Sequence, residues 1–211
     1  MKIHNLELGV LGANCYVVET APAQCVAIDI GGDSQRFLAF LKEKKLRLTK
    51  ILLTHGHYDH IGGVADVQNE TGAEVYIHTD DAYKLESAEQ SLAVQIAREP
   101  FKAVKNYLSI NGDTIINDGD LQFRVMHTPG HSSGSVCYIC EDVIFSGDTL
   151  FRLSMGRTDF FDGSDGAMMN SLIRLSKLDG DYTVYTGHGG QTTLDFERRN
   201  NPYILRLQEK K

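Results

Sequence analysis

The sequence predicts an α/β fold of two mixed β-sheets with helices on the outside. Three observations predict it. Short runs that alternate apolar and polar residues fill the first thirty positions, helical segments then enclose an apolar strand, and a second series of strands begins at Asp113 and leads to another helix. The chain has 211 residues, of which 42% are hydrophobic, enough to bury a sizeable core, so we expect one domain over residues 1–211.

The amino-terminal strands are predicted from alternation. The runs LELGV, NCYVVE and CVAIDI are separated by turn residues, a pattern typical of an antiparallel meander. A helix is expected over residues 34–45, with Asp33 as its N-cap and an apolar face formed by Phe37, Leu38 and Leu41.

The middle of the chain mixes strands and helices. Residues 50–54 form an apolar run, typical of a strand buried on both faces, and this run leads directly into His55. We expect a helix at 63–70, a strand at 74–77 and broken helical segments in the charged stretch 80–105.

The second half of the chain returns to strands. Asn117 to Asp120 is a hairpin signal within this region. A helix is expected at 166–175, and strands are expected at 113–118, 121–128, 134–140, 142–148 and 182–185.

Composition disfavours several classes of protein. Lys and Arg number 21 against 28 Asp and Glu, a formal charge of −7, so a nucleic acid is not an expected partner because phosphate binding relies on clustered cations. No apolar run approaches the ~20 residues that span a bilayer, and the first residues lack a basic segment followed by an apolar core. We expect a cytoplasmic protein with a small-molecule substrate and no membrane partner; the sequence does not indicate an oligomeric state.

The four cysteines are predicted to be buried thiols. Cys137 and Cys140 form a CxxC pattern, but they lie in a predicted strand, where residues three apart point to opposite faces. Cys15 and Cys25 lie in similar apolar runs. A redox or metal role is the less favoured interpretation.

Residues 55–60 carry the strongest chemical signal. His55, His57, Asp59 and His60 place three imidazoles and a carboxylate directly after a buried strand. A lone histidine would more often be structural. A tight loop, however, can direct the first two imidazoles at one ion and Asp59 with His60 at another.

Three later residues fit the same site. His131, Asp148 and His188 each follow a predicted strand and have a neighbouring glycine, as a loop residue aimed into a crowded site requires. With the first motif they supply seven ligands, the complement expected for two ions bridged by one carboxylate and one hydroxide. Imidazole and carboxylate ligands suit Zn, Fe and Mn, and two zinc ions are our default expectation.

The order HxHxDH, GH, GD, GH resembles the metallo-β-lactamase superfamily across nearly the whole chain. The resemblance implies an αββα sandwich with the metal site at the sheet edges. It also implies a first ion held by His55, His57 and His131, a second ion held by Asp59, His60 and His188, and a bridging role for Asp148.

Such a pair of ions is expected to catalyse hydrolysis. It can ionise a shared water at neutral pH and polarise a carbonyl oxygen. The bridging hydroxide then attacks an acyl carbon, Asp59 orients it, and the ions stabilise the oxyanion. A thiolate suits this site as leaving group because a free thiol has a pKa of about 8.5.

Within the superfamily the chain resembles glyoxalase II, the hydroxyacylglutathione hydrolases. GDTLF at 147–151 and the TGHGGQTTLDFERRNNPYI segment carry this resemblance. It implies cleavage of a thioester such as S-lactoylglutathione, with Arg157 in contact with glutathione; a surface ion pair is the alternative for Arg157. The chain ends at Lys211 and so resembles a short, single-domain branch, which leaves another thioester or a small ester as an alternative substrate.

A persulfide dioxygenase is the nearest alternative activity. That branch shares HxHxDH and a GRTDF-like segment, matched here by residues 156–160, and it uses one iron held by the equivalents of His55, His131 and Asp148. The intact second ligand set favours the hydrolase. A lactonase and a non-catalytic protein are further alternatives. Antibiotic hydrolysis is not expected, because the best-known β-lactamases have a cysteine where this chain has Asp148.

Two groups of residues are expected to lie outside this chemistry. His4, His78 and His127 have no ligand-like neighbours in the sequence, so we predict structural or surface roles. Three aromatic residues could line a pocket, although the core is their expected place: Phe151, Phe160 and Phe161.

Overall fold

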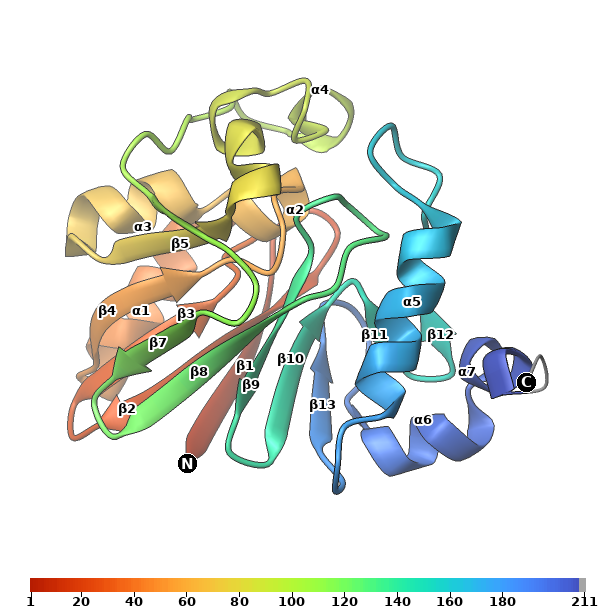
Figure 1. The fold of residues 1–211 in the computed structure, drawn as a ribbon. Helices are drawn as coiled ribbons and strands as arrows, with labels where there is room; N and C mark the ends of the chain where they lie inside the picture. Colours follow the sequence, from red (N-terminus) through yellow and green to blue (C-terminus); the bar gives the residue numbers. More distant parts are fainter. Residues whose placement is uncertain (209–211) are drawn as a thin grey trace.

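The predicted fold class is confirmed by a computed structural model that describes residues 1–208. Two six-stranded mixed sheets face each other, and helices lie on their outer faces (Figure 1). No helix in this described part of the chain combines the length and apolar character needed to cross a membrane.

The first sheet has the strand order β1-β2-β3-β4-β5-β6. β1 to β3 form the predicted antiparallel meander, whereas β3 to β6 run parallel. Because parallel strands end at one edge of a sheet, the segments that follow β3, β4 and β5 meet there. The strands are β1 (Lys2–Leu8), β2 (Ala13–Ala21), β3 (Gln24–Ile28), β4 (Arg47–Leu52), β5 (Glu74–His78) and β6 (Leu108–Ile110).

The second sheet has the order β14-β13-β10-β9-β8-β7. Only β10 and β13 pair in parallel, so the residues that follow these two strands share one edge. A small hairpin, β11 (Leu150–Phe151) and β12 (Ser154–Met155), lies beyond that edge. The sheet strands are β7 (Ile115–Asp118), β8 (Leu121–His127), β9 (Val136–Cys140), β10 (Val143–Gly147), β13 (Thr183–Thr186) and β14 (Thr192–Thr193).

Helices cover both sheets (Figure 1). α1 (Ser34–Lys44) and α3 (Val64–Thr71) pack on the first sheet, and α5 (Asp165–Ser176), α6 (Leu194–Asn200) and α7 (Pro202–Gln208) pack on the second. Three short helical turns lie at the upper edge in Figure 1: α2 (Tyr58–Ile61), the 3-10 helix η1 (Thr79–Glu86) and α4 (Ala93–Ile96).

The buried side chains form three layers. Phe37 and Val64 lie between the outer helices and the first sheet, Phe145 lies between the sheets, and Leu172 lies between the second sheet and its helices. Burial of apolar surface between the sheets, and between each sheet and its helices, is the main force that holds the sandwich together. The arrangement is the expected αββα sandwich.

The cysteine prediction is confirmed. All four thiols are free and buried. Cys137 packs in the layer under the helices and Cys140 packs in the layer between the sheets, so the two residues of the CxxC pattern do point to opposite faces of β9.

Asp33 is the N-cap residue of α1, as predicted, but it does not cap the helix through its side chain. Asp33 has a left-handed backbone (φ 47°), and its side chain makes no cap hydrogen bond. Its carboxylate instead accepts a hydrogen bond from Gly9 N–H at 2.9 Å, which joins the start of α1 to the β1–β2 loop.

Candidate metal centre

The 55–60 motif occupies the turn after β4 and the first residues of α2. His55, His57, Asp59 and His60 are all buried there. The chain folds this way because β4 is paired on both sides and α2 begins at Tyr58, which leaves only a few residues to reverse direction at the sheet edge. Ligand-type side chains are thereby concentrated within one turn.

One group of side chains comprises His55, His57 and His131. Their nitrogen atoms lie within 4.8 Å of one another, and His57 Nδ1 is 2.9 Å from His131 Nε2. His55 Nε2 is buried and has no hydrogen-bond partner. Three imidazole nitrogens that face one point in this way fit a single cation.

A second group comprises Asp59, His60 and His188. His188 Nε2 lies 3.2 Å from Asp59 Oδ2 and 3.3 Å from His60 Nε2. This group therefore offers two imidazole nitrogens and one carboxylate oxygen to a second ion, as the sequence predicts.

Asp148 lies between the two groups. One carboxylate oxygen is 3.4 Å from His60 Nε2, and the other is 3.5 Å from His131 Nε2. Gly147, in a left-handed conformation (φ 48°), makes the turn that directs Asp148 inward, and a side chain at Gly147 would collide with Thr54. The position suits a carboxylate that bridges two ions.

Hydrogen bonds to the other ring nitrogens set the tautomers of three imidazoles. His60 Nδ1 lies 2.8 Å from Asp29 Oδ2, and His131 Nδ1 lies 2.8 Å from the Arg157 carbonyl oxygen. The Thr54 hydroxyl donates to Asp29, so it accepts from His55 Nδ1 at 3.1 Å. Because Nδ1 donates in each ring, Nε2 is the nitrogen left to face a cation, the arrangement found around protein-bound metals.

Asp29 and Thr54 were not identified from the sequence. Asp29 directly follows β3 with a left-handed backbone (φ 55°), and it receives both the N–H and the hydroxyl of Thr54. The signal that could have found it is an acidic residue at the end of an otherwise apolar strand, followed by two glycines.

Asp81 and Lys84 are a second pair that the sequence did not reveal. Asp81 is buried and accepts hydrogen bonds from Gly56 N–H (2.8 Å) and from the Ser132 hydroxyl (2.8 Å), so it ties the 55–60 turn to the loop that carries His131. Lys84 is also buried and pairs with Asp81 (3.2 Å) and Asp162 (2.7 Å). This network fixes the two loops relative to each other.

Burial and neighbouring charges shift the pKa values of these histidines in opposite directions. Burial, reinforced by neighbouring cations, lowers the pKa of His57 to about 2 and also lowers the pKa of His55, so both rings are neutral. Burial alone would lower the pKa of His60, but the carboxylates of Asp148, Asp59 and Asp29 outweigh it and raise the pKa to about 10. His60 and His188 in turn hold the pKa of Asp59 below its usual value against the effect of burial.

The seven side chains fit divalent cations. Among the described residues, the few buried polar atoms without a partner include His55 Nε2, His57 Nε2 and Asp148 Oδ1, all in this cluster. Buried polar atoms without partners are costly, so their concentration here points to an ion. Nitrogen and oxygen donors suit zinc, iron or manganese alike.

A cavity of about 720 Å³ opens over the cluster, and we call it the metal-side cavity. Its lining includes His57, Asp59, His131, Asp148 and His188. The remaining lining residues are Leu11, Leu92, Gln95, Ile96, Phe151, Arg157 and Phe160.

The expectation that the three aromatic residues lie in the core is wrong. Phe151 and Phe160 line the metal-side cavity, and Phe160 contacts the rings of His57 and His131 edge-on. Phe161 is 61% exposed. The loops after β10 project beyond the sheet, so their aromatic residues have no sheet face to pack on.

Arg157 lies at the rim of the metal-side cavity. Its guanidinium makes two hydrogen bonds to the Asp159 carboxylate, at 2.6 Å and 2.7 Å, and lies 4.6 Å from the centre of the Phe160 ring. The predicted alternative of a surface ion pair is therefore present, and the residue still faces the cavity.

The remaining histidines are partly as predicted. His4 pairs with Glu19 on the surface of the first sheet. His78 and His127 were assigned structural or surface roles, and in the fold their rings stack at 4.0 Å with Asp80 beside them. The rings are parallel within 14°, so their in-plane lone pairs do not converge, which favours a stacked pair over a metal site.

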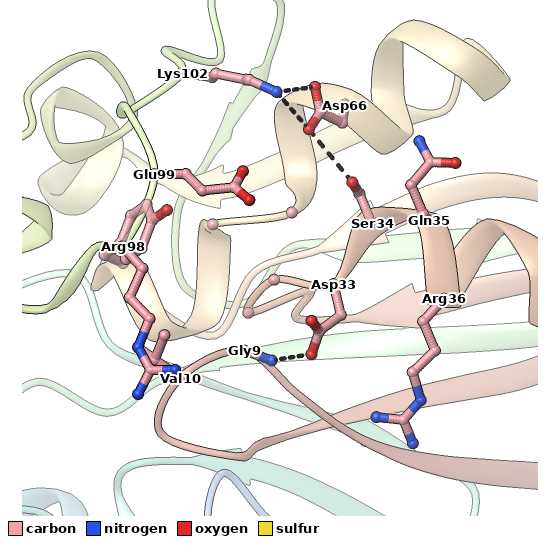
Figure 2. Close-up of a pocket in the computed structure, with 15 residues that line it drawn as sticks. Gly9, Val10, Asp33, Ser34, Gln35, Arg36, Asp66, Arg98, Glu99 and Lys102 are labelled. Atoms are coloured by element: carbon pink, nitrogen blue, oxygen red, sulfur yellow. Dashed lines mark hydrogen bonds and ion pairs between the residues drawn. The ribbon is translucent and has the colours of Figure 1, made fainter.

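A second cavity, of about 690 Å³, lies on the other side of α2, and we call it the back cleft. Figure 2 shows its charged lining: Lys102 bonds to Asp66, Ser34 bonds to Asp66, and Gly9 bonds to Asp33. Its lining contains no histidine or cysteine among the described residues. The carboxylates of Asp33 and Asp66 are thereby bonded to neighbouring groups of the cleft.

Comparison with known proteins agrees with this arrangement. Residues 8–188 match the family described as the Metallo-beta-lactamase superfamily. The chain is 33% identical to "Probable metallo-hydrolase YqgX" of Bacillus subtilis and 30% identical to "Hydroxyacylglutathione hydrolase GloC" of Haemophilus influenzae. In both cases 97% of this chain and 98% of the relative are covered.

Solved structures give the same picture. The BLEG-1 B3 metallo-beta-lactamase is 35% identical, with a TM-score of 0.90 over 96% of this chain and 99% of that one. TTHA1623 in a di-iron-bound form is 35% identical, with a TM-score of 0.82 over 95% and 99%. ETHE1 from Myxococcus xanthus is 26% identical, with a TM-score of 0.79 over 99% and 90%.

Proposed function

Because the chain belongs to the metallo-beta-lactamase superfamily, we propose that it is a hydrolase that uses two divalent metal ions, zinc by default, to cleave a thioester such as S-lactoylglutathione. The observation that carries the proposal is the convergence of buried imidazole nitrogens on Asp148 from two sides. The similarity to a hydroxyacylglutathione hydrolase over 97% of the chain supports the choice of substrate class.

The seven side chains would hold the ions as two groups that share Asp148. When bound, such ions lower the pKa of water and polarise an acyl oxygen. Asp59, at the floor of the cavity, orients the attacking water toward the acyl carbon. Phe160, packed on His57 and His131, keeps bulk water away from that face of the centre.

The proposed reaction balances without a redox partner. The water oxygen bonds to the acyl carbon, the C–S bond breaks, and its electron pair leaves on sulfur as a thiolate. One proton of the water passes to solvent as the acid ionises, and the other neutralises the thiolate. Arg157 at the rim is the proposed contact for the thiol-bearing part of the substrate.

Assay of S-lactoylglutathione, with metal content measured on the same sample, tests the proposal. We expect hydrolysis by protein that holds two ions per chain. His188→Ala should empty mainly the second group, because His55, His57 and His131 do not depend on it. Unchanged hydrolysis and an unchanged metal count in this variant would contradict the two-metal assignment.

A persulfide dioxygenase is the second candidate, because the HxHxDH motif and residues 156–160 also resemble that branch of the superfamily. That activity would need a single iron ion per chain, without a second metal ion, and it would consume oxygen. One iron per chain, with oxygen uptake on glutathione persulfide and no thioester hydrolysis, would replace the hydrolase proposal.

A β-lactam belongs in the same assay. The sequence argument against antibiotic hydrolysis concerns enzymes with a cysteine at the position of Asp148, whereas one similar structure is described as a B3 metallo-beta-lactamase. We expect a chromogenic cephalosporin to be a poorer substrate than the thioester. If the cephalosporin were the better substrate, β-lactam hydrolysis would replace thioester hydrolysis as the proposed activity.

A further inference from the structure

The metal-side cavity has an apolar wall that metal binding does not require. Leu11, Leu92, Ile96, Phe151 and Phe160 line it above the seven ligand-type side chains. They come from the β1–β2 loop, the segment around α4, the β11 strand and the loop after β12. Residues from four separate segments therefore place apolar surface around one opening.

These five residues are partly buried or exposed and do not contribute to the core. Leu11 is 55% exposed, and none of the five belongs to the three buried layers. Apolar side chains grouped around a concave opening mark a ligand site more often than scattered ones do. A volume of about 720 Å³ is typical of small-molecule pockets.

The positive charge at this opening is already paired. Among the described lining residues, Arg157 is the only Lys or Arg. Both of its hydrogen bonds go to Asp159, and its guanidinium rests on Phe160. This bidentate pair occupies two of the guanidinium donors that an anionic ligand would otherwise use.

From this lining we infer that the substrate is a thioester with an apolar acyl chain, held by the wall of Leu11, Leu92, Ile96, Phe151 and Phe160. We also infer that Asp159 weakens recognition of an anionic thiol such as glutathione by keeping Arg157 paired. The inference rests on the proposed thioester hydrolysis and narrows its substrate class.

The first test is a series of thioesters of the neutral thiol N-acetylcysteamine, from acetyl to octanoyl. For each methylene that the wall buries, kcat/KM should rise by about fourfold. A flat or falling series would overturn the inference while leaving thioester hydrolysis established. If no thioester is cleaved at all, the proposed thioester hydrolysis is wrong. The binding test below then shows by itself whether the wall binds apolar groups.

The binding test uses thioethers, which cannot be hydrolysed. Calorimetry compares S-octyl-N-acetylcysteamine with its S-methyl analogue and with S-octylglutathione. We expect both octyl ligands to bind more tightly than the S-methyl analogue. The affinities of the two octyl ligands should differ from each other by no more than about threefold. Equal binding of the methyl and octyl ligands, or a clear preference for glutathione, would contradict the inference.

Two variants on one helical turn provide a matched pair. Ile96 lines the cavity, whereas Val94 is 71% exposed and is not among the lining residues. Ile96→Asp should remove most of the preference for octyl over methyl ligands, and Val94→Asp should keep it. Both positions lie on the outside of the fold, so folding is expected to survive, and unchanged circular dichroism would verify this. Equal effects of the two variants would show that the wall is not the binding surface.

Asp159→Asn tests the role assigned to the ion pair. Released from its carboxylate partner, Arg157 should bind S-octylglutathione more tightly by about threefold, while affinity for the neutral thioether stays unchanged. Adding Arg157→Gln to Asp159→Asn should abolish this gain, because the released guanidinium is then absent. If Arg157→Gln alone weakened S-octylglutathione strongly, Arg157 would be free to bind anions in the parent protein and the role of Asp159 would be wrong.

Discussion

The metal-side cavity and the back cleft are of similar size, about 720 and 690 Å³, and both border the same short helix. α2 and its preceding residue present His57 and Asp59 to one and Tyr58 to the other. In the back cleft, carboxylates such as Asp66 are bonded to neighbouring side chains. In the metal-side cluster, three buried polar atoms have no hydrogen-bond partner within residues 1–208: His55 Nε2, His57 Nε2 and Asp148 Oδ1.

The difference teaches that volume does not identify a site. Charged groups that bond to one another leave little for a ligand to bind. Buried lone pairs that converge are tolerated only if something else binds them. Substitutions on the two sides of α2 should therefore differ in their effects on activity and metal binding.

The largest difference in activity and metal content is expected between substitutions of two carboxylates, Asp148 and Asp33. Asp148→Asn removes the negative charge shared by both ligand groups and should lower kcat/KM by about a thousandfold, with loss of bound metal. Asp33→Asn in the back cleft keeps a residue that tolerates the left-handed backbone and should leave activity and metal content unchanged. Comparable losses in the two variants would remove the distinction between the cavities.

A carboxylate outside the ligand set should have the next largest effect. Asp29→Asn weakens the hydrogen bond that orients His60, so metal affinity should fall by about 10- to 100-fold. Asp118→Asn is the control, because Asp118 is also buried and bonded to Thr20 and Thr49 but lies away from the cluster. It should lower stability without changing metal affinity. The reverse pattern would show that Asp29 serves the fold alone.

The sequence predicted much of this and missed specific parts. Strands β1 to β3 were predictable because turn residues separate short runs rich in apolar residues. The clustered histidines and aspartates were predictable because their side-chain chemistry is unusual. β6 is three residues long and follows a charged stretch, so it carries no pattern of its own. Asp29, Asp81 and Lys84 act through partners distant in the chain, which local sequence does not reveal.

The two ligand groups should also differ in pH dependence. His60, with its pKa raised to about 10, is protonated at neutral pH without metal, and a cation must displace that proton. Affinity of the second group should therefore rise by about tenfold per pH unit through the neutral range. His57, with its pKa lowered to about 2, is already neutral.

Calorimetric titrations at several pH values check this prediction. The His188→Ala variant isolates the first group, whose affinity should stay nearly constant over the same range. A first group that gains affinity with pH as steeply as the second would contradict the assignment of the displaced proton to His60.

The smallest effect is expected in the back cleft. Lys102 is about half exposed where it pairs with Asp66, and exposed ion pairs contribute little. Lys102→Met should therefore change neither the thermal unfolding midpoint nor kcat/KM beyond experimental error. A clear loss of activity would mean that the back cleft takes part in function.

Anomalous diffraction from a crystal of metal-loaded protein, recorded at the absorption edge of the bound metal, tests the central claim most directly. The account predicts two peaks on either side of Asp148, one beside His55, His57 and His131 and the other beside Asp59, His60 and His188. Density for the metals elsewhere, or none between these side chains in a fully loaded sample, would contradict it.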